Sequence, residues 1–382
     1  MRYYIIAGER SGDLHGGNLV KALKRHDVDA KLRGFGGEYM QEEGVELQVH
    51  YRDMAFMGLA EILSNLKKIS NYIKQCKADI NQFKPDVIIL IDYGGFNRRI
   101  AKFGKKNGIK VFYYIPPKVW AWYQRRALEL KANVDRMFVI LPFEKEFFKK
   151  FNWDVDYVGN PVLDAVKAHQ CDDQFAMKHQ MKSGDPVVAL LPGSRKQELN
   201  SIIPLMVEVV KRFPQYQFAV ASVSNLDQSM YGELRSLPNV KFIIEDTYNL
   251  LLNSNAAIVT SGTATLETAL FRVPQVVVYK TSLVSYWIVK MLIKVPYISL
   301  VNLIIGQQVV KEMIQQDANV EDVSTELILL LENQTYRQGI LDAYENLIKI
   351  LDTGSASENA ANLMVNYLQQ DELKISNLKS KI

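Results

Sequence analysis

Along the first 150 residues, short apolar runs alternate with longer segments whose apolar positions recur at helical spacing. The runs are continuous, as expected for parallel strands that helices cover on both faces. This pattern predicts a doubly wound α/β domain. Its strands are expected near residues 3–7, 31–35, 87–91, 111–115 and 136–141, and its helices near residues 14–25, 69–83 and 100–106.

The same alternation resumes after a polar stretch at residues 167–182. It predicts a second doubly wound unit, with strands near residues 187–191, 218–221, 240–244, 257–260 and 275–278. We therefore expect one domain over residues 1–165 and another over residues 166–350. Residues 282–295 are strongly apolar but too few to span a bilayer, which needs about 20 residues, so they predict a partly buried helix with access to lipid.

Composition indicates a soluble globular protein, because 48% of the 382 residues are hydrophobic and 23% are charged. The first nine residues lack the long apolar run and the cleavage site of a signal peptide. Cys76 and Cys171 are the two cysteines and lie far apart, so neither a disulfide framework nor a CxxC site is expected. These features predict a cytoplasmic protein.

The net charge of +4 conceals an asymmetry between the two halves. Residues 1–150 hold 27 Lys and Arg against 17 Asp and Glu, a net +10, which leaves −6 for the rest. Such a basic half predicts attraction to an anionic ligand or membrane surface, although most of its charges are expected on solvated helix faces. Nucleic acid is disfavoured, because the sequence has no zinc-finger spacing, RNP-like motif or long basic tract.

Ligands of parallel sheets bind beyond the carboxyl ends of the strands, so the loops there are the candidates for chemistry. The first of these loops contains Glu9, Ser11 and Asp13. It is neither a GxGxxG nor a Walker loop, and its GxxSG order differs from the GxSxG of hydrolases. Glu9 and Asp13 are therefore interpreted as sugar ligands or as helix caps.

Asp92 directly follows the strand predicted at residues 87–91. A carboxylate at the end of a buried strand loses hydration, which raises its proton affinity and suits it to be a general base. The alternative is an N-cap for the next helix. Because Gly94 and Gly95 intervene before that helix, we favour the functional role.

Two loops of the second unit predict a phosphate site. Arg195 follows the strand at residues 187–191 and can grip phosphate oxygens bidentately. Two strands later a helix opens whose unpaired N–H groups attract anions, and Glu267 lies one turn further, where it can accept hydrogen bonds from a sugar hydroxyl. An ordinary Ser/Thr cap with a surface Glu is the alternative. The helix start consists of Ser261, Gly262, Thr263, Ala264 and Thr265.

Metal sites are not expected. The five histidines are scattered, and the two DxD-like pairs at residues 27–29 and 154–156 lie in charged, turn-like surroundings. We likewise predict no cofactor. A phosphate leaving group would then be stabilised by Arg195 and helix N–H groups.

Together these loops resemble those of the lipid-A-disaccharide synthase family, inverting glycosyltransferases of the GT-B architecture. The likeness extends over nearly the whole chain, through residues 7–13, 57–61, 84–97, 119–122, 141–145, 190–195, 261–267 and 299–302. It implies two doubly wound, Rossmann-like domains facing a cleft. The first would face the acceptor and the membrane, the second would bind the donor, and a helix at about residues 351–382 would pack back on the first.

The resemblance also implies a reaction: 2,3-diacylglucosamine passes from its UDP derivative to the 6-hydroxyl of 2,3-diacylglucosamine 1-phosphate, giving a β-1,6 disaccharide and UDP. The expected location is the cytoplasmic face of the inner membrane of a Gram-negative cell, and an oligomer is conceivable. Asp92 would take the hydroxyl proton, Arg195 and the helix start would hold the diphosphate, and Glu267 the ribose. Asn302 matches a polar position of the family's active site and is expected to bind the UDP-sugar donor. Candidates for contact with the acceptor or sugar are Glu9, Ser11, Asp13, Met57, Asn97 and Trp120.

The chain departs from the common family pattern at a few positions. Gly95 replaces a second acid of an IDxxDFN sequence, so the base assignment falls on Asp92 alone. Lys118 replaces a Ser, Val301 a Pro, and residues 307–308 an Arg-Glu pair, which affects acceptor recognition more than the reaction. The alternatives are another UDP-N-acetylglucosamine transferase or 2-epimerase of the same architecture, and a non-catalytic lipid- or nucleotide-binding protein.

Overall fold

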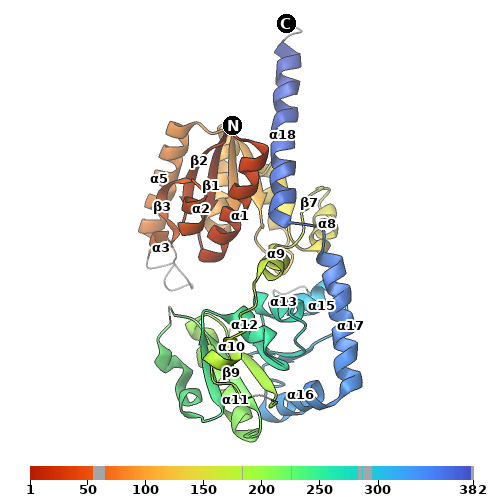
Figure 1. The fold of residues 1–382 in the computed structure, drawn as a ribbon. Coiled ribbons are helices and arrows are strands. Elements are labelled where there is room, and N and C mark those ends of the chain that lie inside the picture. The colour runs from red at the N-terminus through yellow and green to blue at the C-terminus, as the bar shows by residue number, and fades with distance from the viewer. Residues whose placement is uncertain (55–64, 183, 225, 283–285, 287–294, 380–382) are drawn as a thin grey trace. The chain divides into compact units, whose positions relative to one another are not determined.

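The computed structural model describes all residues except 55–64, 183, 225, 283–285, 287–294 and 380–382 (Figure 1). The chain forms two compact units. The first comprises Met1–Pro161 together with Thr353–Ile382, and the second comprises Val162–Asp352. Each unit is built on one parallel β-sheet, so its fold is described separately below.

The sheet of the first unit has seven strands in the order β3-β2-β1-β4-β5-β6-β7. Neighbouring strands are parallel. The chain moves outward in one direction from β1 and in the other from β4, so the sheet has its switch point between these two strands. The strands are β1 (Arg2–Ala7), β2 (Lys31–Gly36), β3 (Glu46–His50), β4 (Val87–Ile91), β5 (Lys110–Tyr114), β6 (Arg136–Val139) and β7 (Asp156–Tyr157).

Helices cover this sheet, and one of them comes from the far end of the chain. α18 (Ala356–Lys379) lies alongside α1 (Arg10–His26) (Figure 1). Met364 and Val365 of α18 share a buried core with Leu19 of α1, and burial of such side chains is the main favourable term in folding. The other helices are α2 (Glu38–Glu42), α3 (Tyr51–Met54), α5 (Leu66–Phe83), α6 (Gly94–Lys106), α7 (Arg126–Asn133) and α8 (Pro142–Lys149).

The second unit repeats this plan with six strands in the order β10-β9-β8-β11-β12-β13, and its switch point lies between β8 and β11. The strands are β8 (Val187–Leu191), β9 (Gln217–Ser222), β10 (Val240–Ile244), β11 (Ala256–Thr260), β12 (Gln275–Tyr279) and β13 (Lys311–Ile314). The helices are α9 (Pro161–Ala168), which begins at the boundary between the units, α10 (Phe175–Lys178), α11 (Lys196–Arg212), the 3₁₀ helix η1 (Gln228–Ser236), α12 (Thr247–Leu252), α13 (Thr263–Leu270), α15 (Leu300–Ile305), α16 (Val320–Glu332) and α17 (Gln334–Leu351).

The prediction of two doubly wound parallel sheets is confirmed. The sequence pattern missed β3, β7 and β13, which lie at sheet edges. Most of their residues are partly or fully exposed, so none of them presents the continuous apolar run that marks a central strand such as β4, all five residues of which are buried. The predicted apolar helix at residues 282–295 falls mostly outside the described residues.

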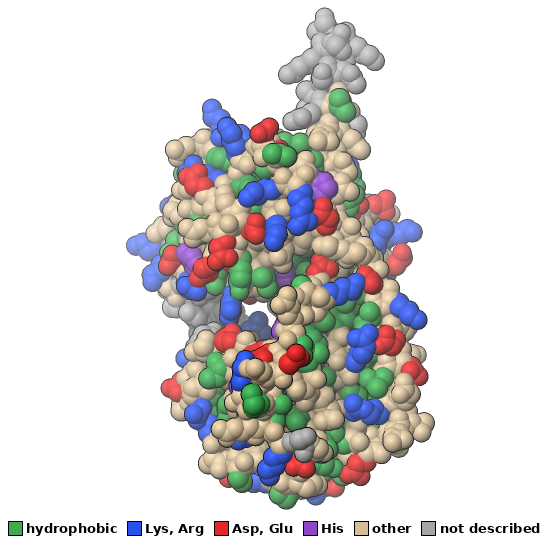
Figure 2. All heavy atoms as spheres, in the orientation of Figure 1, with side chains coloured by type: hydrophobic (Ala, Val, Ile, Leu, Met, Phe, Trp, Pro, Cys, Tyr) green, Lys and Arg blue, Asp and Glu red, His purple; other side chains and the backbone are tan. Residues whose placement is uncertain are grey.

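Many basic residues of the first unit are paired with acids. The Nη1 of Arg98 lies 3.2 Å from Glu129, and the Nζ of Lys105 lies 2.6 Å from Asp135. On the face shown in Figure 2, basic and acidic side chains are interspersed. Such exposed pairs contribute little stability.

Candidate active site

The loops with Glu9, Asp92, Arg195 and Ser261 follow the strands that flank the two switch points. In the first unit, the loop with Glu9 follows β1 and Asp92 follows β4, and these strands are neighbours. In the second unit, Arg195 comes after β8 and Ser261 after β11, again neighbouring strands. Ligands of doubly wound sheets bind at such points.

Asp92 has an unusual backbone. Asp92 and Tyr93 are consecutive residues in the left-handed region, with φ of 46° and 47°, a conformation that non-glycine residues rarely adopt. Hydrogen bonds hold it: the carbonyl of Asp92 accepts from Tyr113 Oη at 2.6 Å and from Asn97 Nδ2 at 2.8 Å. Strain of this kind is kept mainly at functional sites. The turn therefore fixes the direction in which the Asp92 side chain leaves the sheet.

The electrostatic surroundings of Asp92 suit a proton acceptor. Burial raises the pKa of its carboxyl group, while the positive charge of Lys118 and a backbone hydrogen bond from Tyr93 oppose that rise. A carboxylate with a raised pKa binds a proton more readily than an ordinary Asp. Asp92 can thus act as a general base toward a hydroxyl group.

The loop after β1 interlocks with the Asp92 turn. A Cβ atom at Gly8 would lie 2.2 Å from the Tyr93 ring, so only glycine fits there. The Tyr93 hydroxyl donates to the carbonyl of Met54 at 2.8 Å, and burial, with the negative charge of Glu9, raises the pKa of Tyr93 to about 12. Glu9 therefore lies near the Asp92 turn, and Ser11 is exposed in the first turn of α1.

Asp13 has a structural role that differs from the predicted one. Its side chain is fully buried, and its carboxylate accepts hydrogen bonds from the backbone N–H groups of Gly37, Tyr39 and Met40 at 2.6, 3.0 and 3.3 Å. It thereby satisfies donors at the start of α2, which would otherwise lack partners. We therefore interpret Asp13 as a cap, and a cap of α2 rather than of its own helix.

Asn97 and Trp120 are also buried in the scaffold. The Asn97 amide donates to the carbonyls of Ile91 and Asp92, so this buried side chain supports the Asp92 turn. The Trp120 indole donates to Glu144 Oε1 at 3.1 Å, and burial raises the pKa of Glu144 to about 7. Both residues are therefore positioning residues, in contrast to the sugar contact predicted for them. Met57 falls outside the described residues.

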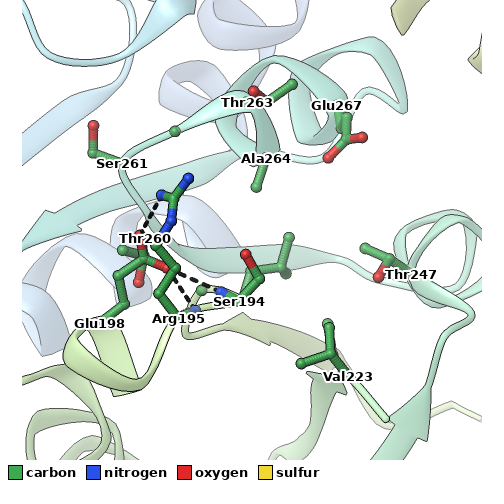
Figure 3. Close-up of a pocket in the computed structure, with 14 residues that line it drawn as sticks. Ser194, Arg195, Glu198, Val223, Thr247, Thr260, Ser261, Thr263, Ala264 and Glu267 are labelled. Atoms are coloured by element: carbon green, nitrogen blue, oxygen red, sulfur yellow. Dashed lines mark hydrogen bonds and ion pairs between the residues drawn. The ribbon is translucent and has the colours of Figure 1, made fainter. Parts of the chain in front are cut away.

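The second unit contains a cavity of about 290 Å³ at its switch point (Figure 3). The loop after β8 forms one wall and the start of α13 forms another. Because the first N–H groups of a helix have no partner within it, this wall favours an anion. The lining residues are Leu191, Gly193, Ser194, Arg195, Glu198, Ala221, Val223, Thr247, Thr260, Ser261, Gly262, Thr263, Ala264 and Glu267.

Most of the predicted segment at residues 261–267 reaches this cavity. The Ser261 hydroxyl donates to the carbonyl of Ile298 at 3.0 Å, which anchors the loop, while Thr263 is exposed at the helix start. Thr265 differs: it is fully buried, and its hydroxyl donates to the carbonyl of Gly262 at 2.8 Å. Thr265 therefore shapes the turn and does not line the cavity.

Glu267 also lines the cavity. Burial raises the pKa of its carboxyl group, and the Tyr248 hydroxyl donates to Oε1 at 3.3 Å, which opposes the rise. The Tyr248 hydroxyl, on α12, thereby orients the carboxylate of Glu267, on α13. It can accept hydrogen bonds from sugar hydroxyls at the cavity wall.

Arg195 is joined to the helix that follows it. Its guanidinium is 62% exposed, and its Nη1 donates to Glu198 Oε1 at 3.0 Å. Glu198 Oε2 also accepts from the backbone N–H groups of Ser194 and Arg195 at 2.9 and 3.1 Å. This arrangement is the acidic half of a capping box, and it holds the cation at the cavity (Figure 3).

Asn302 is withdrawn from the cavity by its hydrogen bonds. Its side chain is fully buried. Its Nδ2 donates to the Val310 carbonyl and to Glu312 Oε1, both at 2.9 Å, while its Oδ1 accepts from the N–H groups of Val309 and Val310. All four interactions tie α15 to the segment that enters β13. Asn302 is accordingly a structural residue, contrary to the prediction that it contacts the donor.

Sequence reasoning missed three further features of the cavity. Glu198 was detectable, because an acid three residues after Arg195 fits the N3 position of a capping box. Val223 and Thr247 carry no such signal. Val223 follows β9 and Thr247 begins α12, and both reach the cavity only through the order of the strands in the sheet.

No described helix has the length and apolarity needed to cross a membrane. Over the same described residues, His, Cys, Asp and Glu side chains form no group of three or more that could hold a metal ion. Catalysis without a metal stays a prediction.

The two doubly wound sheets, the second with a cavity at its switch point lined by Arg195 and the start of α13, define a two-domain protein of the GT-B class. UDP-GlcNAc 2-epimerase from Neisseria meningitidis bound to UDP-GlcNAc has the same fold, with a TM-score of 0.66 over 97% of this chain and 100% of that chain at 14% identity. The chain belongs to the lipid-A-disaccharide synthetase family, whose model matches residues 3–365.

A sequence relative supports this membership. The lipid-A-disaccharide synthase of Syntrophus aciditrophicus (strain SB) is 39% identical over 375 residues, covering 96% of this chain and 98% of that protein. The glycotransferase of kitacinnamycin shares the fold, with a TM-score of 0.63, 15% identity and coverage of 95% and 97%. The predicted function in forming the lipid A disaccharide is therefore confirmed, whereas the 2-epimerase alternative rests on the fold alone.

Proposed function

We propose that the chain transfers 2,3-diacylglucosamine from UDP to the 6-hydroxyl of 2,3-diacylglucosamine 1-phosphate, with inversion. The observation that carries the proposal is the cavity of the second unit, where Arg195 and the start of α13 offer a cation and N–H groups to one diphosphate. Glu267 accepts hydrogen bonds from the ribose. The first unit takes the acceptor.

Proton and electron movements follow from these roles. Asp92 removes the proton of the 6-hydroxyl, and the oxygen attacks C1 of the donor sugar from the face opposite UDP. The C1–O bond to the diphosphate breaks, and UDP leaves with the electron pair. Arg195 and the N–H groups of α13 stabilise the charge that develops on the diphosphate.

The donor identifies the reaction. Purified protein, given the acceptor, is expected to turn over UDP-2,3-diacylglucosamine and to leave UDP-N-acetylglucosamine unchanged, as measured by UDP release and by mass of the sugar product. Turnover restricted to the unacylated donor would instead favour another enzyme of this architecture. Binding of UDP without turnover of either donor would favour a non-catalytic protein.

We also propose that the first unit docks on an anionic membrane through the loop after β5. Trp122, Tyr123 and Leu128 are 48%, 50% and 54% exposed, and Arg125 and Arg126 are exposed among them. The Arg126 guanidinium lies 4.6 Å from the Tyr123 ring centroid. Aromatic side chains flanked by arginines fit the interface of an anionic bilayer. This loop and Asp92 follow the neighbouring strands β5 and β4, which suits a lipid acceptor.

Replacing Trp122 and Tyr123 by Ser is expected to lower binding to vesicles containing phosphatidylglycerol by at least about tenfold, since two apolar groups no longer enter the interface. Co-sedimentation with the vesicles measures this binding. Vesicles of phosphatidylcholine, which have no net charge, test whether binding depends on the charge of the bilayer. Leu252→Ser, at an exposed apolar residue of the second unit, is the control. Equal binding by the double variant and the unsubstituted protein would refute this docking surface.

A further inference from the structure

Glu198 places a negative charge inside the cavity proposed to bind a diphosphate. Three N–H donors converge on its carboxylate: the backbone N–H groups of Ser194 and Arg195 on Oε2, and the Arg195 guanidinium on Oε1. Figure 3 shows these interactions within the lining of the cavity. Backbone N–H groups and a guanidinium of this kind are donors that a loop can also offer to a phosphate group. The carboxylate therefore has the contacts of a bound phosphate group.

The backbone is shaped to admit this carboxylate. Gly193 has φ of +101°, and a Cβ atom there would lie 2.3 Å from Glu198 Oε2. A side chain at this position would thus exclude the carboxylate and strain the turn. The close approach to Gly193 brings Glu198 onto the loop at the point where a ligand's phosphate would contact the backbone.

We infer that Glu198 is an internal counter-ion that competes with the diphosphate of the nucleotide for Arg195 and the two N–H groups. Glu198 is three residues from Arg195 on the same helix start, so its carboxylate can bind Arg195 again as soon as a ligand leaves. Diphosphate binding must displace it or bring like charges close together, and either process weakens binding. Glu198 thereby lowers the affinity for UDP, the product that must leave before a new donor enters. The inference rests on the proposed donor site.

Glu198→Gln tests the charge separately from the cap. The Gln side chain keeps an oxygen that can accept from the Ser194 and Arg195 N–H groups but has no negative charge. We expect the Kd of UDP to fall about three- to tenfold, because that is the change in affinity expected when a partly exposed ion pair no longer has to be broken. UMP should gain less, and uridine should bind unchanged. Titration calorimetry with these three ligands measures the series.

Glu208→Gln is the matched control. Glu208 also lies on α11 and also pairs with a basic residue, Lys211 at 3.1 Å, but it does not line the cavity. UDP affinity should be the same in this variant as in the unsubstituted protein.

The opposite outcomes are distinguishable. An unchanged Kd of UDP in Glu198→Gln would overturn the inference, and a raised Kd would show that Glu198 positions Arg195 for the ligand. Both results would leave the donor site in place. Failure of the unsubstituted protein to bind UDP would refute the donor site itself.

Discussion

Asp92→Asn is expected to reduce turnover by about 10²–10⁴-fold, the usual contribution of a general base, while UDP binding stays unchanged. The amide cannot accept the proton of the acceptor hydroxyl, yet it has nearly the shape of the carboxyl group it replaces. The UDP-binding residues proposed here belong to the second unit, which does not contain Asp92. Single-turnover assays and calorimetry with UDP measure the two effects.

The pH dependence gives a second readout of the same substitution. Asp92 must be ionised to act as a base, so activity is present above its pKa and is lost as pH falls through it. Since burial raises that pKa, the acid limb of kcat/KM should lie above the ordinary range of an Asp side chain, and Asp92→Asn should lack this limb.

Stability should change in the opposite sense. A raised pKa means that the folded protein favours the protonated form, so ionised Asp92 destabilises the fold at neutral pH. Asp92→Asn is therefore expected to have an equal or higher Tm at pH 8, and the difference should shrink at low pH. Loss of turnover in a variant that unfolds earlier than the unsubstituted protein would not support a base.

Asp86→Asn provides the control, since Asp86 precedes β4 at the opposite end of the same strand and accepts from the Arg2 N–H group at 2.7 Å. Near-normal turnover is expected there. If Asp92→Asn retained the activity of that control, the base would have to be another residue.

The sequence predicted the central strands well because their apolar runs are continuous. β4 and β8 match their predicted ranges, and Asp92 and Arg195 follow these two strands. The location of Asp92 and Arg195 beyond the carboxyl ends of the strands could thus be predicted from the sequence. The direction of a side chain could not, because it depends on partners distant in sequence: Asp13 accepts from residues 24 to 27 positions away.

Asn302 illustrates the same limit. A polar residue that matches a polar position of the family's active site fits a ligand contact, but the amide of Asn302 instead bonds to the backbone of Val310, eight residues further along the chain. Buried polar groups need such partners. A motif therefore predicted which loops form the site, whereas the hydrogen bonds separated residues that face a ligand from those that hold the loops.

Arg195→Gln is expected to lower kcat/KM for the donor by about 10²–10³-fold, as when one preorganised donor to a developing anion is lost. Among the described residues that line the cavity, Arg195 carries the positive side chain, and in the proposed mechanism its guanidinium stabilises the diphosphate as UDP leaves. Arg195→Lys should retain part of the activity, since an ammonium group keeps the charge without the bidentate geometry.

Arg212→Gln is the control, because Arg212 lies at the far end of α11 and pairs with Glu321 at 2.7 Å. A kcat/KM for Arg195→Gln within about threefold of this control would show that the cavity stabilises the leaving group without the guanidinium.

Arg195→Gln also leaves the Glu198 carboxylate at the cavity without its cationic partner. Part of its cost is then repulsion between Glu198 and the diphosphate, in addition to the lost attraction. The double variant Arg195→Gln/Glu198→Gln should consequently bind UDP more tightly than Arg195→Gln alone. Calorimetry on the four proteins of this cycle measures the coupling between the two side chains, and equal affinity of the single and double variants would assign the whole effect to Arg195.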